Sequence, residues 1–221
     1  MSARRLNGKS KVVIIEDHPM FRERLSHLID KSNDLRVCAE VDNIRDGFAA
    51  IQDINPDVVI VDISLKGSNG LELLKNLKAH DNTVPVLVLS MHDESLYAER
   101  ALRAGARGYI TKHEASVNVM AAIRQVMEGK IYLSSGSLSQ IMGKVMKGRD
   151  VTVQPIDRLA DRELEVFELI GRGLTTREIG ARLHLGVTTV DTYKGRIKEK
   201  LQLENSARLR MAAARWLQQR E

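Results

Sequence analysis

The sequence predicts an α/β fold, a doubly wound parallel sheet of five strands, followed by a small all-α domain. From Lys11 to about Leu133, short apolar runs rich in β-branched residues alternate with amphipathic stretches of helical spacing. This alternation favours right-handed crossovers between parallel strands. Beyond Leu159 every apolar pattern has helical spacing instead. A chain of 221 residues with 43% hydrophobic content is long enough for the two separate cores that this division requires.

The periodicities give the bounds of the elements in the first domain. The expected strands are Val12–Ile15, Leu35–Val41, Val58–Val61, Val86–Leu89 and the weaker Gly108–Thr111. The expected helices are Phe21–Ile29, Ile44–Ile54, Leu71–Lys78, Leu96–Ala104 and Ser116–Met127. Continuous apolar strands of this kind are buried on both faces, because helices cover the two sides of a parallel sheet.

A polar segment separates the two domains. Ser134–Ser137 is polar, Leu138–Met146 has the spacing of a short helix, and Lys147–Leu159 contains glycine, proline and aspartate residues. This composition is typical of an interdomain linker. We therefore expect a first domain over residues 11–133, a linker with a short helix over 134–158, and a second domain over 159–221.

Capping residues mark the helices of the second domain. Asp161 and Thr175 are suitable N-caps, Glu178 completes a capping box with Thr175, and Gly173 ends the first helix. The expected helices are Arg162–Arg172, Thr176–Leu183, Val187–Leu201 and Ser206–Gln219, with a turn at His184–Gly186 between the second and the third.

The positive charge of the chain is concentrated in its C-terminal part. The formal net charge is +5; residues 1–135 hold 18 basic and 18 acidic side chains, whereas residues 136–221 hold 16 and 11. A surplus of this sign favours a polyanionic partner for the second domain.

No segment of the sequence predicts export or a membrane anchor. Residues 1–11 are polar and basic with no apolar stretch behind them, and nowhere do about 18 apolar residues run together. Cys38 is the single cysteine, so no intramolecular disulfide is expected, and its strand predicts a small core residue. We expect a soluble, cytoplasmic protein with a loose N-terminal tail and no membrane partner.

Four of the expected strands end on polar side chains. Glu16 and Asp17 follow the first strand, Asp62 the third, Ser90 the fourth and Lys112 the fifth. Ligands bind at the carboxyl ends of parallel strands, so these groups are expected at one edge of the sheet. Three carboxylates repel one another unless a cation lies among them, and Mg²⁺ prefers such oxygen ligands. We expect Asp17 and Asp62 to bind Mg²⁺ directly and Glu16 to bind it through water.

This combination of groups is typical of phosphoryl transfer to a carboxylate. Asp62 is the expected nucleophile, Lys112 the cation that neutralises the phosphoryl oxygens, and Ser90 a hydrogen-bond donor to one of them. Taken singly, each residue has a structural interpretation, and Asp62 alone could cap a helix or a turn. Five groups in register on four strands favour the functional interpretation. His18 is interpreted as a helix-start residue that faces solvent, because the chemistry needs no imidazole.

The first domain resembles the receiver domain of bacterial two-component response regulators, which has a flavodoxin-like fold. The resemblance covers about Lys11 to Leu133 and rests on VVIIEDHPMFRERL, VVIVDISL, VLVLSMHDE and GARGYITK. It implies that Asp62 accepts a phosphoryl group from the phosphohistidine of a sensor histidine kinase. It also implies that the backbone carbonyl of Ser64 is a further Mg²⁺ ligand.

The same resemblance implies a switch. Ser90 would turn toward the phosphoryl group, and Tyr109 would change its packing and alter the surface of the fourth helix, fifth strand and fifth helix. An aromatic residue that is simply half-buried at a strand is the alternative interpretation of Tyr109. Many receivers have a cis proline after the lysine, where this chain has His113.

The third helix of the second domain has a surface suited to DNA. Its inward face is expected to contain Val187, Val190, Ile197 and Leu201. Its outward face is expected to carry Thr188, Asp191, Thr192, Gly195 and Arg196, flanked by Lys194, Lys198 and Lys200. Lysine and arginine attract phosphates, whereas threonine and aspartate meet base edges in the major groove. A solvated basic face is the alternative, but the capping box, the short turn and the charge surplus favour a helix-turn-helix domain.

This region resembles the helix-turn-helix domain of the LuxR class, as found in the NarL and FixJ group of regulators. The resemblance covers about Leu159 to Gln219 and rests on LADRELEVFELIGRGLTTREIGARLHL and TTVDTYKGRIKEKLQL. It implies that Asp191, Thr192 and Gly195 face the groove and that Lys194 and Arg196 lie near the DNA backbone. Thr175, Thr176 and Arg177 could also hold phosphates at the start of the preceding helix. Gly186 and Thr188 differ from the capping serine and the basic residue that are common in the family.

Together the two domains predict a phosphorylation-dependent DNA-binding transcription regulator, not an enzyme, with an operator in double-stranded DNA as partner. Phosphorylation of Asp62 would favour a homodimer or free the second domain. The last helix resembles the family's dimer contact, while packing of Leu209 and Trp216 on their own domain is equally consistent.

Two other functions stay open. One is a Mg²⁺-dependent phosphatase that turns over an aspartyl phosphate, although Ser64 stands where such enzymes place a general acid. The other is a constitutive DNA-binding protein whose receiver serves only as an interaction module.

Overall fold

The chain divides into two compact units, Met1–Lys147 and Gly148–Glu221. The computed structural model describes residues 8–92, 94–134, 136–139 and 155–219. Most of the short helix expected at Leu138–Met146 and of the linker expected at Lys147–Leu159 therefore lies outside the described residues. Within the described part of the chain, no helix combines the length and the apolar character that crossing a membrane requires.

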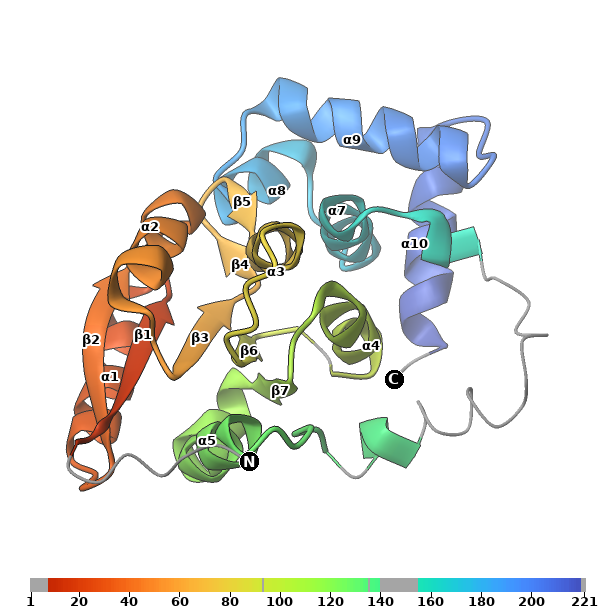
Figure 1. Ribbon diagram of the computed structural model, residues 1–221. Coiled ribbons are helices and arrows are strands. Elements are labelled where there is room, and N and C mark those ends of the chain that lie inside the picture. Colours follow the sequence, from red (N-terminus) through yellow and green to blue (C-terminus); the bar gives the residue numbers. More distant parts are fainter. Residues whose placement is uncertain (1–7, 93, 135, 140–154, 220–221) are drawn as a thin grey trace. The chain divides into compact units, whose positions relative to one another are not determined.

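The first unit contains a five-stranded parallel sheet (Figure 1). Its strands are β1 (Ser10–Ile15), β2 (Leu35–Val41), β3 (Val58–Asp62), β6 (Val86–Ser90) and β7 (Gly108–Thr111), in the order β2-β1-β3-β6-β7. Each predicted strand is present, and the doubly wound α/β fold is confirmed. In the register of the sheet Ile15 pairs with Val61, and Asp62 pairs with Leu89. The polar residues that follow the strands therefore meet at one edge.

Helices cover both faces of this sheet, which is why its central strands are buried throughout (Figure 1). On one face, α1 (Pro19–Asp30) and α5 (Lys112–Met127) share a core with β1, β3 and β6. The other face carries α2 (Ile44–Ile54), α3 (Gly70–Ala79) and α4 (Glu94–Ala104). The packing of α2 is so close that a Cβ atom on Gly47 would lie 2.5 Å from Cδ1 of Ile15.

Apart from element bounds that shift by one or two residues, three details of the first unit differ from the sequence predictions. Helix α5 begins at Lys112 and not at Ser116, because Thr111 caps it and its hydroxyl accepts the N–H of Glu114 at 3.3 Å. A small antiparallel pair, β4 (Ser64–Leu65) and β5 (Ser68–Asn69), occupies a loop for which no strand was predicted. Cys38 is half-buried and not in the core, because β2 has a register shift at this point against β1.

The segment after α5 returns to the sheet and covers the outer edge of β7. Tyr132 forms an isolated parallel bridge with Gly108, and its carbonyl accepts the N–H of Tyr109 at 2.9 Å. Two residues further on, the N–H of Ser134 donates to Oε1 of Glu94 at the start of α4, at 2.7 Å. These contacts attach the beginning of the expected linker to the first unit.

The second unit is helical among its described residues. It contains a short 3₁₀ helix (Pro155–Arg158), α7 (Asp161–Gly171), α8 (Thr176–Leu183), α9 (Val187–Lys200) and α10 (Ser206–Gln218). A Cβ atom on Gly171 would lie 2.7 Å from the carbonyl oxygen of Ala213, so glycine permits the close approach of α7 and α10. The ring of Trp216 on α10 lies 5.5 Å from that of Phe167 on α7, centroid to centroid, which favours packing of Trp216 on its own domain.

Two helix ends of the second unit answer specific predictions. Asp161 was expected as an N-cap, but it is the first residue of α7 and Ala160 is the cap. The reason is that the side chain of Glu163 bonds back to the N–H of Ala160, at 2.8 Å, and fixes the helix one residue earlier. Gly173 ends the same helix as expected, with a φ of +84° that favours glycine.

Candidate functional site

The carboxylates predicted at the strand ends lie together at the edge of the sheet. Glu16, Asp17 and Asp62 are buried, with exposed fractions of 1%, 3% and 1%. One ligand atom from each of them and one ring nitrogen of His18 all lie within 4.8 Å of one another. Anionic oxygens at this spacing repel one another unless they share a cation. The three acids therefore lie together at one edge of the sheet, as the sequence predicted.

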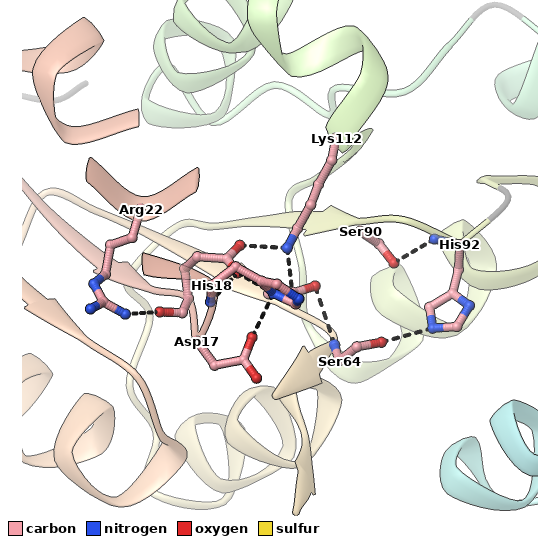
Figure 2. Close-up of polar contacts among 9 residues, drawn as sticks. Asp17, His18, Arg22, Ser64, Ser90, His92 and Lys112 are labelled. Carbon is pink, nitrogen blue, oxygen red and sulfur yellow. Dashed lines mark hydrogen bonds and ion pairs between the residues drawn. The ribbon is translucent and has the colours of Figure 1, made fainter. Parts of the chain in front are cut away.

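Lys112 projects from the first turn of α5 into this cluster (Figure 2). Its Nζ atom lies 2.6 Å from Oε2 of Glu16 and 2.8 Å from Oδ2 of Asp62. The nitrogen also lies 4.8 Å from the ring centroid of Phe21. Burial alone would lower the pKa of Lys112, but the charges of Asp62 and Glu16 outweigh burial and raise it. The ammonium form is therefore the stable one.

One ammonium does not neutralise three carboxylates. Burial raises the pKa of Glu16, and the negative charge of Asp62 raises it further, against the opposing effect of Lys112. Oδ1 of Asp17 is also buried, and it lies 2.8 Å from Nδ1 of His18. With its three carboxylates ionised, the cluster holds more negative than positive charge, which a bound cation would balance, and all its carboxylate oxygens are hard ligands. This donor set fits a small divalent cation such as Mg²⁺.

His18 lies beside the acids and is mainly exposed, as expected for a residue at a helix start. It is the N-cap residue of α1, and 64% of its side-chain surface is exposed. Its backbone N–H donates to Oε1 of Glu16 at 2.9 Å, which helps to orient that carboxylate.

The loop after β6 connects Ser90, through His92, to the loop after Asp62 (Figure 2). Ser90 is fully buried, and its hydroxyl accepts the backbone N–H of His92 at 3.0 Å. The phenol of Tyr109, also fully buried, donates to the carbonyl of His92 at 3.0 Å. Nε2 of His92 lies 2.8 Å from the hydroxyl oxygen of Ser64, and the imidazole ring stacks on the ring of Tyr97.

His92 was missed by the reasoning from sequence. Its only signal there is its position, two residues after a polar strand end, which places a polar side chain at the same edge of the sheet. Its contacts with Ser90, Tyr109 and Ser64 make it a residue through which these groups are connected.

The loop that carries Asp62 is held by a close backbone approach. A Cβ atom on Gly70 would lie 2.0 Å from the carbonyl oxygen of Asp62, and the N–H of Gly70 donates to the carbonyl of Ile63 at 2.7 Å. The N–H of Ser64 donates to Oδ1 of Asp62 at 3.2 Å, which orients the carboxylate. Glycine at position 70 is therefore a geometric requirement of this loop.

In the second unit, α8, the turn and α9 have the predicted bounds within one residue. Thr175 accepts the N–H of Glu178 at 3.3 Å, and its own N–H donates to the Glu178 carboxylate at 2.7 Å, so the capping box is confirmed. Gly180 permits the tight turn, because a Cβ atom there would lie 2.7 Å from the carbonyl oxygen of Leu185.

The face of α9 predicted to point outward is exposed, with one correction to the inward set. Thr188, Asp191, Thr192, Gly195 and Arg196 are exposed, whereas Lys194 and Lys198 are half-buried. Val190 and Ile197 are fully buried and Leu201 is half-buried, but Val187, expected inside, is 47% exposed. It is the first residue of α9, where the helix has no preceding turn to cover it.

Lys194 connects the two helices of this motif. Its Nζ donates to the hydroxyl of Thr176 at the start of α8, at 2.9 Å, and to Oδ1 of Asp191 at 3.2 Å. Lys200 instead turns to α7, where its Nζ lies 2.7 Å from Oε2 of Glu163. An ammonium and the first N–H groups of a helix lie close together at Thr176, which is an arrangement suited to a phosphate.

Comparison with known proteins gives consistent matches over both units. The response regulator receiver domain matches residues 12–124, and the luxR family of bacterial regulatory proteins matches residues 157–213. The chain is 37% identical to the virulence-factor transcription regulator BvgA of Bordetella pertussis, over 87% of this chain and 90% of that protein. It is 29% identical to the nitrate/nitrite response regulator NarL of Escherichia coli, over 94% of each.

Among solved structures, a LuxR-family two-component response regulator from Aurantimonas is similar. Its TM-score is 0.58 at 27% identity, and the match covers 63% of this chain and 99% of that one.

Proposed function

Since this chain belongs to the NarL/FixJ-type response regulators, which have a receiver domain and a LuxR-type DNA-binding domain, we propose that Asp62 is its phosphoacceptor. The family regulates transcription through DNA binding that depends on phosphorylation. The observation that carries the assignment is the position of Asp62, buried at the strand ends with the Lys112 ammonium 2.8 Å from its carboxylate. The phosphoryl donor is the phosphohistidine of a sensor histidine kinase.

In the reaction, an oxygen of Asp62 attacks phosphorus while the bond between phosphorus and the imidazole nitrogen of the donor breaks. The imidazole leaves with the electron pair and takes up a proton. Lys112 stabilises the charge that the phosphoryl oxygens carry in the transition state, and the hydroxyl of Ser90 donates to one of them. Burial of these groups strengthens each of the interactions, because little water screens them.

The residues that would hold Mg²⁺ are Glu16, Asp17, Asp62 and the backbone carbonyl of Ser64. Bound Mg²⁺ supplies positive charge to the carboxylates and to the phosphoryl oxygens. Asp17 is the residue whose buried oxygen most needs such a partner, because its contact at 2.8 Å is with the ring of His18, which is charged only when protonated.

Ser90 and Tyr109 are the proposed switch residues. When Ser90 turns toward a phosphoryl group, its hydroxyl must leave the N–H of His92, the same residue whose carbonyl accepts the Tyr109 phenol. A change at Ser90 therefore acts on Tyr109 through one residue of the loop. This coupling is the physical route that we propose from phosphorylation to the surface of α4, β7 and α5.

For DNA binding we propose two groups of residues on the second unit. The residues that face the major groove are Thr188, Asp191, Thr192 and Gly195. Those that hold phosphates are Thr175, Thr176, Arg177, Lys194, Arg196 and Lys198. The bond from Lys194 to Thr176 supports this division, since it gathers the ammonium and the start of α8 at one point.

The remaining features of the proposal concern assembly. The receiver domain spans residues 11–133, the linker 134–158 and the DNA-binding domain 159–221. Phosphorylation favours a homodimer on a double-stranded operator. The protein works in the cytoplasm, where the operator lies, and it acts as a regulator and not as an enzyme.

The decisive experiment labels the full chain with acetyl phosphate and Mg²⁺ and measures its mass and its affinity for DNA. The DNA is a duplex selected from a random pool by the labelled protein. We expect one phosphoryl group in the wild type, none in Asp62→Asn, and one in the control Asp53→Asn, an exposed aspartate of α2. Labelling of Asp62→Asn would contradict the assignment.

The two alternatives give other results in the same experiment. A phosphatase would release inorganic phosphate over many turnovers from a small phosphate ester. A constitutive DNA-binding protein would bind the selected duplex equally well with and without the phosphoryl group. We expect a single phosphorylation per chain and a higher DNA affinity after it.

A further inference from the structure

The backbone of Glu16 is held on both sides. Its N–H donates to the carbonyl of Val41 at the end of β2, at 2.9 Å. Its carbonyl accepts a hydrogen bond from Nη1 of Arg22, on the first turns of α1, at 2.5 Å (Figure 2). Arg22 also donates its backbone N–H to the carbonyl of His18 at 3.0 Å. Arg22 therefore holds the turn that carries Glu16 and Asp17 in two ways, through its backbone N–H and through its guanidinium.

Arg22 also forms a long ion pair with a carboxylate on β2. Its Nε atom lies 4.0 Å from Oε2 of Glu40. The other oxygen of Glu40 accepts the hydroxyl of Ser26 at 2.7 Å, so two residues of α1 hold this carboxylate. A guanidinium loses little freedom on binding because its donors are fixed in a plane. Glu40 thus places a negative charge beside the guanidinium of Arg22, at ion-pair distance and beyond hydrogen-bond reach.

The electrostatics explain why a pair of opposite charges is needed here. An isolated guanidinium close to the acids would repel a divalent cation. The negative charge of Glu40 balances the positive charge of Arg22. The remaining effect of Arg22 on the site is its hydrogen bond to the Glu16 carbonyl. That bond restrains the plane of the peptide between Glu16 and Asp17, and so the two Cα atoms from which both side chains project.

We propose that Arg22, paired with Glu40, is a positioning residue for the divalent-cation site. It keeps the carboxylates of Glu16 and Asp17 turned toward one cation without touching that cation. This inference rests on the proposed function, since it assumes that these acids bind Mg²⁺. Groups that orient metal ligands in this way change metal affinity although they are not ligands.

The test is Mn²⁺ binding by the full, unphosphorylated chain, followed through the electron paramagnetic resonance signal of free Mn²⁺, with Mg²⁺ as competitor. We expect Arg22→Ala to weaken Mn²⁺ binding about tenfold, as is common for residues that orient metal ligands. Arg22→Lys restores part of the affinity, because an ammonium can still donate to the Glu16 carbonyl. Arg24→Ala is the matched control, since Arg24 is an exposed arginine on the same helix.

Glu40→Gln tests the same claim from the other partner, and it serves if Arg22→Ala does not fold. Glu40→Gln leaves the charge of Arg22 without its partner, so this variant also binds Mn²⁺ more weakly than the wild type. In the double variant Arg22→Ala with Glu40→Gln, the loss of Mn²⁺ binding free energy is smaller than the sum of the two single losses. In acetyl phosphate labelling, the Mg²⁺ concentration for half the maximal rate rises in Arg22→Ala, whereas the rate at saturating Mg²⁺ stays close to that of the wild type.

Asp17→Asn separates the two levels of the proposal. If Asp17→Asn loses Mn²⁺ while Arg22→Ala and Glu40→Gln bind it as the wild type does, the positioning role is overturned and the metal site stands. If the wild type binds no Mn²⁺, or Asp17→Asn binds it equally well, the metal site itself is wrong and the positioning role falls with it.

Discussion

The ammonium of Lys112 lies 2.8 Å from Oδ2 of Asp62, and the two residues come from a helix start and a strand end that are 50 positions apart. The same nitrogen lies 2.6 Å from Glu16. Lys112 thus occupies the side of the acidic cluster that faces α5. A cation and an incoming phosphoryl group must both be accommodated beside it.

Replacing Lys112 by alanine should separate metal binding from phosphorylation. Removing one positive charge from the cluster strengthens its attraction for a divalent cation, so Mn²⁺ binding becomes at least as tight as in the wild type. The rate of labelling by acetyl phosphate falls by about a hundredfold, because a buried donor to the transition state is lost. A Mn²⁺ titration and a labelling time course check the two effects; weaker Mn²⁺ binding would contradict this account.

Gly70→Ala should damage the phosphoacceptor loop without changing any charged group. The new methyl would meet the Asp62 carbonyl at 2.0 Å, so the loop must move. We expect a loss of about 1–3 kcal/mol in the free energy of unfolding, as for other overpacked sites, together with slower labelling of Asp62. Urea unfolding and mass spectrometry measure both. Gly8→Ala, where no heavy atom lies within 4 Å of the new Cβ, should behave as the wild type.

Lys194→Ala should weaken binding to every DNA sequence to a similar degree. Each phosphate contact contributes a released counterion, so the slope of log affinity against log salt falls by about 1. Fluorescence anisotropy on the selected duplex and on an unrelated duplex measures this. Lys200→Ala is the matched control on the same helix, because its ammonium is paired with Glu163 on α7, whereas that of Lys194 lies at the start of α8. An unchanged salt slope in Lys194→Ala would remove Lys194 from the phosphate contacts.

Gly195→Ala should have opposite effects on stability and on DNA binding. The position is exposed on α9 with no heavy atom within 4 Å of a Cβ, so alanine stabilises the helix by up to about 1 kcal/mol. If α9 lies in the groove with Gly195 toward the DNA, the methyl takes up space at the contact and the affinity falls. Equal affinity for the selected duplex would place Gly195 outside the interface.

The ion pair of Asp34 and Arg124 should stabilise the receiver only above acidic pH. Two hydrogen bonds from Arg124 lower the pKa of Asp34 to about 2, from an ordinary value of 3.8. A lowered carboxyl pKa contributes stability above 3.8 that is lost as the pH falls toward about 2. Both side chains are about half exposed, so the contribution stays below about 1 kcal/mol. Urea unfolding should separate Asp34→Asn from the wild type fully at pH 7, by about half as much at pH 3, and by little at pH 2. A difference that stays constant over this range would argue against the linkage.

The parts of the fold that local chemistry specifies were predictable from the sequence. The bounds of α2 and α8 match the predictions residue for residue, because Asn43 and Thr175 cap them and their apolar spacing is regular. The strand ends were equally clear, since an apolar run that stops on an acid, a hydroxyl or an ammonium is visible without a structure.

The contacts of loops could not be predicted in this way. The bond between His92 and Ser64 joins residues 28 apart, and its existence depends on the paths of two loops set by packing elsewhere. The bond from Arg22 to the Glu16 carbonyl ends on a backbone atom, which carries no sequence signal. The start of α5 was wrong for a different reason: Thr111 and Glu114 are a capping pair, but the strand pattern that ends at Thr111 obscured them.

The return of Tyr132 to the sheet has a consequence for how this protein meets others. A bare outer strand offers unpaired backbone groups to any passing chain and so invites aggregation. Here Tyr132 occupies that position beside β7, while the opposite margin, β2, is irregular at Cys38 and carries Arg36 and Glu40. Both edges of the receiver sheet are thus poor templates for the addition of a strand from another chain. Contacts between this domain and other molecules therefore have to be made by side chains.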